Sequence, residues 1–235
     1  MALGAVSTLV LVSGCVNNTV LRERGVENLR KKEYATAAGN FQGAVNKKPT
    51  DYESQYYLGA TLLQLGRPLD AQIPLEQALT LKPDNPEWTP KILDGLAESL
   101  YQQKRYETLH TFLEEASLYW GTTDDFLRQG KYLEKTGDVD NAMLAYKKAG
   151  LWSAPNDARP YLAMADLYEA LGDRPNTLKA LGMAYFSNPN DPGLPERFRK
   201  HGIVPGPTVG VKPEKVEKPP RGMLPFPLPK IPGSF

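Results

Sequence analysis

Residues 52–85, YESQYYLGATLLQLGRPLDAQIPLEQALTLKPDN, and residues 158–191, ARPYLAMADLYEALGDRPNTLKALGMAYFSNPND, share a spacing of small and turn-forming residues. Each stretch has Gly or Ala at its eighth position, Gly at its fifteenth and Pro at its thirty-second. Small residues fit where two helices approach closely, and Gly fits where a helix ends in a left-handed residue. Pro cannot continue a helix and forces the chain to turn. Each stretch therefore predicts a pair of helices.

The same spacing recurs along most of the chain, with starts at Asn18, Tyr52, Pro90, Thr123 and Ala158. One helix pair cannot bury its apolar face, so stacking against neighbouring pairs must supply the core. The predicted array spans residues 18–191, with repeats near 18–51, 52–85, 90–122, 123–157 and 158–191.

This pattern resembles the tetratricopeptide repeat (TPR). The resemblance implies an all-α fold, a right-handed α-solenoid of about five helix-turn-helix repeats. Two features depart from the family pattern: the extra residues 86–89 before the third repeat, and Leu109 where Ala is typical. Trp120 and Trp152 follow the second helices of the third and fourth repeats, and we expect them to be packed between elements.

Both ends of the chain differ in composition from the array. A short amphipathic stretch within residues 192–204 predicts a capping helix. Residues 205–235 hold nine of the 21 prolines, so we expect a disordered, largely unpacked Pro-rich tail. In this tail Leu224, Phe226, Leu228 and Ile231 alternate with prolines, and a docking peptide is the alternative interpretation.

The N-terminus has an uncharged apolar run, ALGAVSTLVLVSG over residues 2–14, followed by Cys15. The run is shorter than the roughly 20 residues that a membrane-spanning helix needs. Val12-Ser13-Gly14-Cys15 resembles the lipobox of bacterial lipoproteins. The resemblance implies a signal peptide over residues 1–14, a lipidated Cys15 (palmitate among its acyl chains) and a short lipidated N-terminus over residues 15–17. Val16 stands where an Asp would mark inner-membrane retention, which favours the outer membrane of a bacterial cell envelope. The alternative is an uncleaved apolar helix with Cys15 in the core.

The composition excludes several classes of function. The formal charge of +1 argues against a general nucleic-acid binder, and a single cysteine excludes a Cys-built metal cluster. The two histidines leave little material for a metal or acid–base site. His110 has Glu107 and Glu114 at helical spacing, but a solvated helix face explains this arrangement. We expect no enzyme activity, catalytic residue, metal, cofactor or small-molecule substrate.

The TPR resemblance implies that the first helix of each repeat lines a concave groove that binds protein or peptide partners. Its groove positions, the second, fifth, ninth and twelfth of a repeat, correspond to Arg22, Val26, Leu29, Tyr56, Ala60, Leu63, Asp94, Glu98, Tyr101, Leu127, Lys131, Glu134, Arg159, Leu162, Asp166 and Glu169. The N-terminal half of this set is apolar and aromatic, and the C-terminal half is charged.

Together these features predict a membrane-tethered scaffold for protein–protein interactions in cell-envelope assembly. TPR lipoproteins help assemble outer-membrane proteins, pilus secretins or cell-wall hydrolase complexes, and the resemblance does not choose among them. The alternatives are a soluble cytoplasmic TPR adaptor with an uncleaved N-terminus, and a self-assembling structural protein that forms a homo-oligomer.

Overall fold

The computed structural model describes residues 17–216 of the chain. Over this range the secondary structure is entirely helical, and this confirms the all-α fold predicted from the sequence. The helices are α1 (Asn18–Arg30), α2 (Tyr34–Lys47), α3 (Tyr52–Gln64), α4 (Pro68–Leu81), α5 (Trp88–Gln102), α6 (Tyr106–Tyr119), α7 (Thr123–Lys135), α8 (Val139–Trp152), α9 (Arg159–Ala170), α10 (Arg174–Ser187), α11 (Leu194–Lys200) and the short 3₁₀ helix η1 (Pro207–Val209). The predicted signal peptide, Cys15 and residues 217–235 lie outside the described residues.

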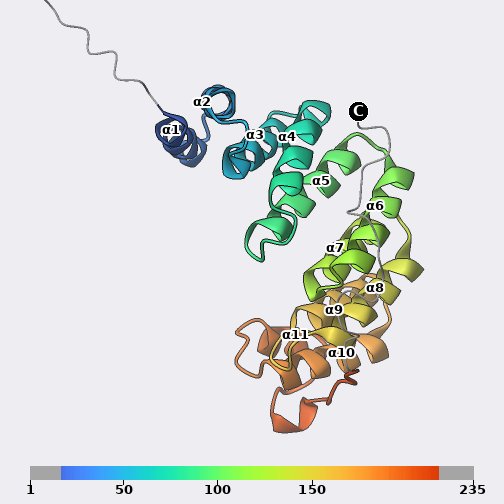
Figure 1. Cartoon of the computed structure of the whole chain (residues 1–235). Helices are drawn as coiled ribbons and strands as arrows, with labels where there is room; N and C mark the ends of the chain where they lie inside the picture. The colour runs from blue at the N-terminus through green and yellow to red at the C-terminus, as the bar shows by residue number, and fades with distance from the viewer. Residues whose placement is uncertain (1–16, 217–235) are drawn as a thin grey trace, which may run out of the picture. The chain divides into compact units, whose positions relative to one another are not determined.

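Helices α1 to α10 form five consecutive helical hairpins, one in each stretch where the sequence predicts a repeat (Figure 1). The chain divides between Leu81 and Lys82 into two compact bodies. We call the described part before this point the N-terminal body (17–81, α1–α4) and the part after it the C-terminal body (82–216, α5–α11 and η1). The division falls inside the predicted array, near the end of its second repeat.

The division falls beside the extra residues before the third repeat, because that connection is bound to the C-terminal body. The Thr89 hydroxyl donates to the backbone carbonyls of Lys82 (3.1 Å) and Pro83 (3.0 Å). The indole Nε1 of Trp120 donates to the same Pro83 carbonyl at 3.0 Å. Trp120 is buried and Trp152 packs edge-on to Phe126 with ring centroids 5.0 Å apart, which confirms the packing expected for both indoles.

The turn inside each hairpin requires a left-handed residue. Gly66, Gly137 and Gly172 provide it with φ of +69°, +88° and +73°. The first and third hairpins have no glycine there, and Lys32 and Lys104 adopt φ of 60° and 58° instead. All five turns therefore have the same backbone geometry, although two of them place a side chain in a conformation that favours glycine.

Inside the first, second and fourth hairpins the eighth residue of the first helix is a glycine that faces a large side chain of the second helix. A Cβ added to Gly25 would lie 2.5 Å from the Phe41 ring, and one added to Gly59 would lie 2.5 Å from Leu75 Cγ. At Gly130 the added carbon would come still closer to the Tyr146 ring. The missing side chain lets the two helix backbones approach and lets the facing ring fill the space between them.

We expect Gly130→Ala to destabilise the C-terminal body by about 1–3 kcal/mol, the usual cost of inserting a carbon into a packed core. This loss should exceed the gain of roughly 1 kcal/mol that Ala brings to a helix interior. The measurement is urea-induced unfolding followed by circular dichroism. Gly39→Ala is the matched control, because a Cβ there meets nothing within 4 Å and should stabilise the chain. Equal effects of the two substitutions would contradict this account of the packing.

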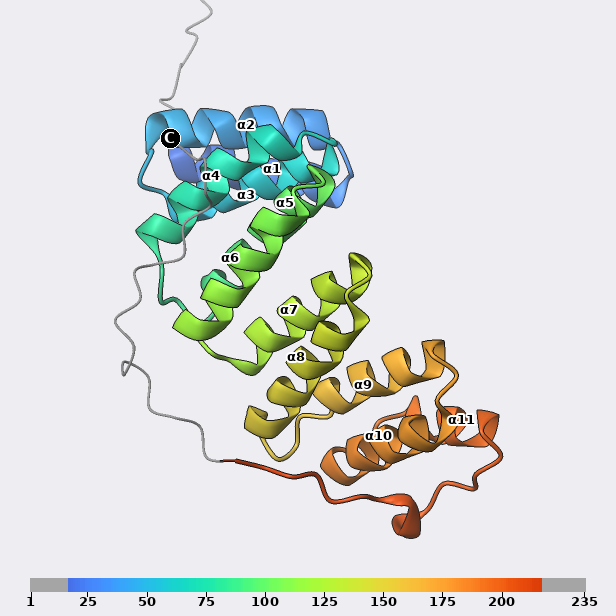
Figure 2. The same ribbon diagram turned by 90° about the vertical axis from the view of Figure 1, so that its right-hand side faces the viewer.

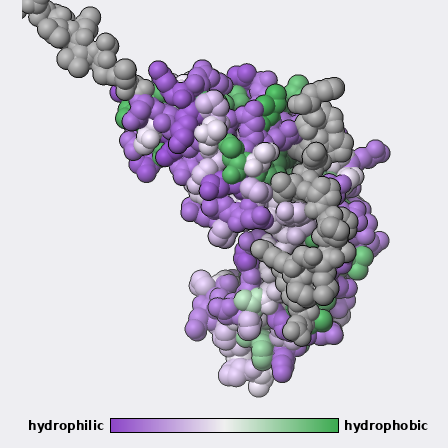
Figure 3. All heavy atoms as spheres, viewed as in Figure 1, coloured by the Kyte–Doolittle hydropathy of each residue, from purple (hydrophilic) through white to green (hydrophobic). Residues whose placement is uncertain are grey.

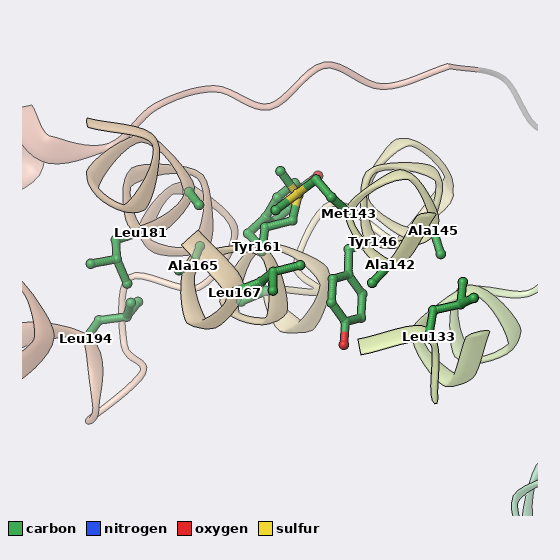
Figure 4. Close-up of a cluster of buried hydrophobic side chains, with 14 of the residues drawn as sticks. Leu133, Ala142, Met143, Ala145, Tyr146, Tyr161, Ala165, Leu167, Leu181 and Leu194 are labelled. Atoms are coloured by element: carbon green, nitrogen blue, oxygen red, sulfur yellow. The ribbon is translucent and has the colours of Figure 1, made fainter. Parts of the chain in front are cut away.

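The last hairpins and α11 share one core in the C-terminal body (Figure 4). Tyr146, Tyr161, Leu167 and Leu181 fill it, and the Tyr161 hydroxyl donates to the Gly150 carbonyl at 2.9 Å. Helix α11 lies within the stretch predicted to cap the array and contributes two fully buried side chains to this core, Leu194 and Phe198.

The segment after α11 differs from the predicted unpacked tail. Residues 203–216 run alongside α10 towards the end of α8 (Figure 2). The Val211 amide donates to the Gly182 carbonyl (3.0 Å), and the Val216 amide donates to the Leu151 carbonyl (3.3 Å). The backbone here makes almost no helix, as the proline content suggested, but apolar side chains and amides hold it against the helices. The unpacked tail expected from residue 205 is therefore wrong for residues 205–216.

Candidate partner-binding face

We use the name first-helix face for the surface that the groove positions predicted above form within each body. In the N-terminal body, the predicted set contains one arginine, Arg22. This residue of α1 forms ion pairs with residues at the start of the next hairpin. Arg22 pairs with Asp51 at 2.6 Å and with Glu53 at 3.1 Å. Burial alone would raise the pKa of Asp51, but hydrogen bonds from Ser54 and Asn18 and the charge of Arg22 outweigh it and lower that pKa. These contacts fix α1 against the start of α3.

The other predicted residues of this body are mostly half-buried. Val26, Leu29, Tyr56 and Ala60 keep part of their surface, and the Tyr56 ring packs against Tyr57 with centroids 5.4 Å apart. Leu63 is only 8% exposed, so it belongs to the core and offers little surface to a partner. The exposed surface of this part of the face is therefore apolar, as expected. Its area is smaller than the sequence suggested, because Leu63 is buried.

In the C-terminal body the predicted residues of α5 are matched by residues of α7 one repeat later. The Asp94 carboxylate accepts a hydrogen bond from Arg128 Nε at 2.6 Å. The Glu98 carboxylate accepts one from the Tyr132 hydroxyl at 2.8 Å and lies 3.6 Å from Lys135 Nζ. These contacts form two successive cross-links between the first helices of neighbouring repeats.

Aromatic rings complete this arrangement. The rings of Tyr101 and Tyr132 lie 5.8 Å apart, and Lys135 Nζ lies 4.7 Å from the centroid of Tyr101 and 5.0 Å from that of Tyr132. Burial, followed by the hydrogen bond to Glu98, raises the pKa of Tyr132, so its hydroxyl remains a donor. The pKa of Glu98 is lowered, because hydrogen bonds from Gln102 and Tyr132 and the charge of Lys135 outweigh its burial.

Arg128 is a buried cation at the centre of this network. Its side chain is 3% exposed, and it donates to Asp94, to Asp125 (2.8 Å) and to the Pro90 carbonyl (3.1 Å). Burial would lower the pKa of Arg128, but the two carboxylates raise it, so the guanidinium stays charged. Asp125 is equally buried and also accepts from the backbone amide and hydroxyl of Thr122, closing a capping box at the start of α7. The start of α7 is therefore fixed to α5.

The remaining predicted charges are paired in the same way. Arg159 of α9 pairs with Asp124 of α7 at 2.6 Å. Asp166 and Glu169 of α9 pair with Arg197 of the capping helix at 2.7 and 3.2 Å. Glu169 also pairs with Lys200, and the hydrogen bond from Lys200 lowers the pKa of the Glu169 carboxyl.

Four other predicted positions of the C-terminal body fall into two groups. Leu127 and Leu162 are half-buried against the shared core and hold the face in place. Lys131 and Glu134 are exposed; Lys131 Nζ lies 5.3 Å from the Tyr132 ring, and Glu134 accepts from the Tyr146 hydroxyl at 2.8 Å. Hydrophilic side chains cover most of the molecular face that Figure 3 shows.

The sequence interpretation missed the partners of these residues: Arg128, Tyr132, Lys135, Arg197 and Lys200. One signal was present. Each of the first three stands 34 residues after the residue that it contacts. Arg128 and Tyr132 are hydrogen-bonded to Asp94 and Glu98, and Lys135 lies over the ring of Tyr101. Complementary chemistry at a one-repeat offset predicts contact between neighbouring first helices.

His110 takes part in no cluster of metal ligands. Its Nε2 lies 2.8 Å from the Thr136 hydroxyl, which joins α6 to the end of α7. No group of three or more His, Cys, Asp or Glu residues within 17–216 is arranged to hold a metal ion. Among the helices of this same range, none is both long and apolar enough to cross a membrane.

Solved structures with this fold are TPR proteins. TTC0263 from Thermus thermophilus, described as a thermophilic TPR protein, aligns with a TM-score of 0.55 and 21% identity. The alignment covers 78% of this chain and 97% of TTC0263. MamA aligns over 82% of this chain and 99% of its own (TM-score 0.54, 20% identity). Pseudomonas aeruginosa PilF aligns over 79% and 84% (TM-score 0.55, 20% identity). The fold is of the TPR type. No family model matches the chain, and no curated protein sequence matches it.

We expect Arg128→Met to destabilise the C-terminal body by about 3 kcal/mol, because it leaves the Asp125 carboxylate buried without its cation. Asp94→Asn is the control: the Asp94 side chain is 62% exposed, and Arg128 keeps Asp125 as a partner. Such an exposed pair should contribute about 1 kcal/mol or less. Urea-induced unfolding measures both variants. Losses of equal size would show that Arg128 is not the centre of this network.

Proposed function

We propose that this protein is a non-enzymatic scaffold that binds a polypeptide partner on the first-helix face. The observation that supports this most strongly is the set of cross-links among α5, α7, α9 and α11. They hold charged and aromatic side chains in fixed positions before any partner arrives, and such preorganisation reduces the entropy lost on binding. A TPR-type fold is consistent with this function and does not by itself establish it.

The chemistry of the face indicates the kind of partner. The face of the C-terminal body combines the ring of Tyr101 and the ammonium of Lys131 with the carboxylates of Asp94 and Glu134. A peptide with an apolar or aromatic anchor and polar flanks of both charges fits this surface, since aromatic residues concentrate binding energy and charges set the register.

A photo-crosslinking amino acid at position 131 should form a discrete covalent adduct with a partner in cells of the native host, because Lys131 is exposed on the face. The same amino acid at position 115, exposed on the second helix α6, is the control and should give none. Tyr101→Ala should reduce the adduct at position 131 at least tenfold. An adduct at 115 alone, or one unaffected by Tyr101→Ala, would overturn the assignment of this face.

We further propose that the scaffold is tethered to a bacterial membrane, with the outer membrane favoured, and serves cell-envelope assembly. The support is the apolar run over residues 2–14 and the lipobox-like sequence ending at Cys15. Two or more acyl chains give stable anchoring. A tether confines the scaffold to the membrane surface and raises its effective concentration for a partner there.

Intact mass and membrane fractionation of the expressed chain, beside a Cys15→Ala variant, test the tether. We expect a chain that begins at an acylated Cys15 and sediments with membranes, and a variant that leaves them. An unmodified chain that retains Met1 and stays in the supernatant would support the alternative, a cytoplasmic TPR adaptor. The crosslinking result at position 131 is independent of this outcome.

A further inference from the structure

The second helices of the C-terminal body have a large apolar residue at the same place. It is the thirteenth of 14 residues in each helix: Leu118 in α6, Leu151 in α8 and Phe186 in α10. We call these three residues the apolar row. The second helices of the N-terminal body have Asn46 and Thr80 at this place. The apolar row offers surface that a covering segment can remove from water.

The segment after α11 passes two members of the apolar row. A Cβ added to Gly210 would lie 3.9 Å from the Cβ of Phe186, an ordinary van der Waals distance. Six residues later, the Val216 amide donates to the Leu151 carbonyl at 3.3 Å. The segment therefore passes from α10 to α8 in six residues, against the order of the hairpins.

Lys215 fixes this segment to the C-terminal end of α8. Its Nζ donates to the carbonyls of Gly150 and Ser153, both at 2.9 Å, and to the Ser153 hydroxyl at 2.7 Å. The last carbonyls of a helix lack partners within the helix, and the helix dipole favours a cation there. Two of the three acceptors are backbone carbonyls, which the end of any helix offers. The docking on α8 thus combines a basic residue with the backbone amide that follows it.

The third member of the apolar row, Leu118, is 51% exposed. Because the hairpins repeat, the step from α8 to α6 should take about as many residues as the step from α10 to α8. Six residues lead from Lys215 to Arg221 and from Val216 to Gly222. A basic residue and a backbone N–H thus recur, in the same order, where the chain would reach α6.

The charges of α6 suit this part of the chain. Lys147, the ninth residue of α8, and the acidic Glu214 of the segment line the same hollow. The ninth residue of α6 has the opposite sign: it is Glu114, followed by Glu115, and both are exposed. Opposite charges therefore favour the basic Arg221 at α6, as they favour an acidic residue beside α8.

The end of α6 differs from that of α8 in one acceptor. The residues equivalent to Gly150 and Ser153 are Ser117 and Trp120, which offer two backbone carbonyls but no hydroxyl after the helix. The chain beyond position 222 continues with Met and Leu, two large apolar side chains. We therefore expect the contact at α6 to depend mainly on apolar burial.

We propose that residues 217–224 dock on the C-terminal end of α6 of the same chain. The Gly222 amide donates to the Leu118 carbonyl. Met223 and Leu224 cover the Leu118 side chain. The segment after α11 would then clamp three successive second helices, α10, α8 and α6. This clamp does not involve the first-helix face and is independent of any lipid anchor.

Trypsin digestion of the full chain, followed by mass spectrometry, tests the docking. The Arg221–Gly222 bond lies inside the proposed segment, and the Lys230–Ile231 bond lies beyond it. A synthetic peptide of residues 217–235 gives the unprotected cleavage rate of each bond. We expect the first bond to be cut at least tenfold more slowly in the chain than in the peptide, and the second at a similar rate in both.

Leu118→Asn should remove this protection, because it replaces the apolar contact with a polar side chain of similar size. Leu144→Asn is the matched control: Leu144 is 54% exposed on α8 and lies outside the apolar row. Equal rates in the chain and the peptide, or protection that survives Leu118→Asn, would overturn the proposal. Protection that increases with chain concentration would place a second copy on α6 and would overturn it as well.

Disulfide trapping tests the same contact directly. Full chains carrying Cys15→Ala, Leu118→Cys and Met223→Cys are oxidised mildly in dilute solution with detergent. We expect a monomer with an internal disulfide, two hydrogens lighter than the reduced chain. The control carries Leu144→Cys in place of Leu118→Cys and should stay reduced. No disulfide in the first variant, or equal yields in both, would contradict the docking, and circular dichroism melting confirms that both variants are folded.

Discussion

The contact between a missing side chain on one helix and a ring or branched side chain on its partner governs this structure. Gly25 faces Phe41, Gly59 faces Leu75 and Gly130 faces Tyr146, each inside one hairpin. Because no Cβ intervenes, the two helices approach closely and present a regular pair of faces to the next hairpin. The core, the first-helix face and the hollows between second helices all follow from repeating this hairpin.

On the side of the first helices, repetition aligns residues one repeat apart. Asp94 meets Arg128 and Glu98 meets Tyr132, while Arg197 of α11 provides the partner of Asp166 at the end of the array. The capping helix thus ends the apolar core with Leu194 and Phe198 and also neutralises the last acidic pair. A rigid surface with fixed charges and rings results, and this is why we assign partner binding to it.

On the opposite side, repetition leaves a groove between second helices. Residues 211–216 border the groove between α8 and α10, where the amides of Val211 and Val216 and the Lys215 ammonium donate to backbone carbonyls of these two helices.

The sequence alone determined the all-α repeat fold, the helix pairs and the glycine turns, because these depend on residues within one repeat. It also placed the groove positions on the first helices, but it did not show that Leu63 is buried or that Arg22, Asp94 and Glu98 are already paired. The tertiary structure decided these points, since each depends on a neighbouring repeat. It also decided the division at Leu81 and the packing of residues 205–216. A proline-rich composition excludes a helix, whereas only the shape of the adjoining groove determines whether an extended chain docks there.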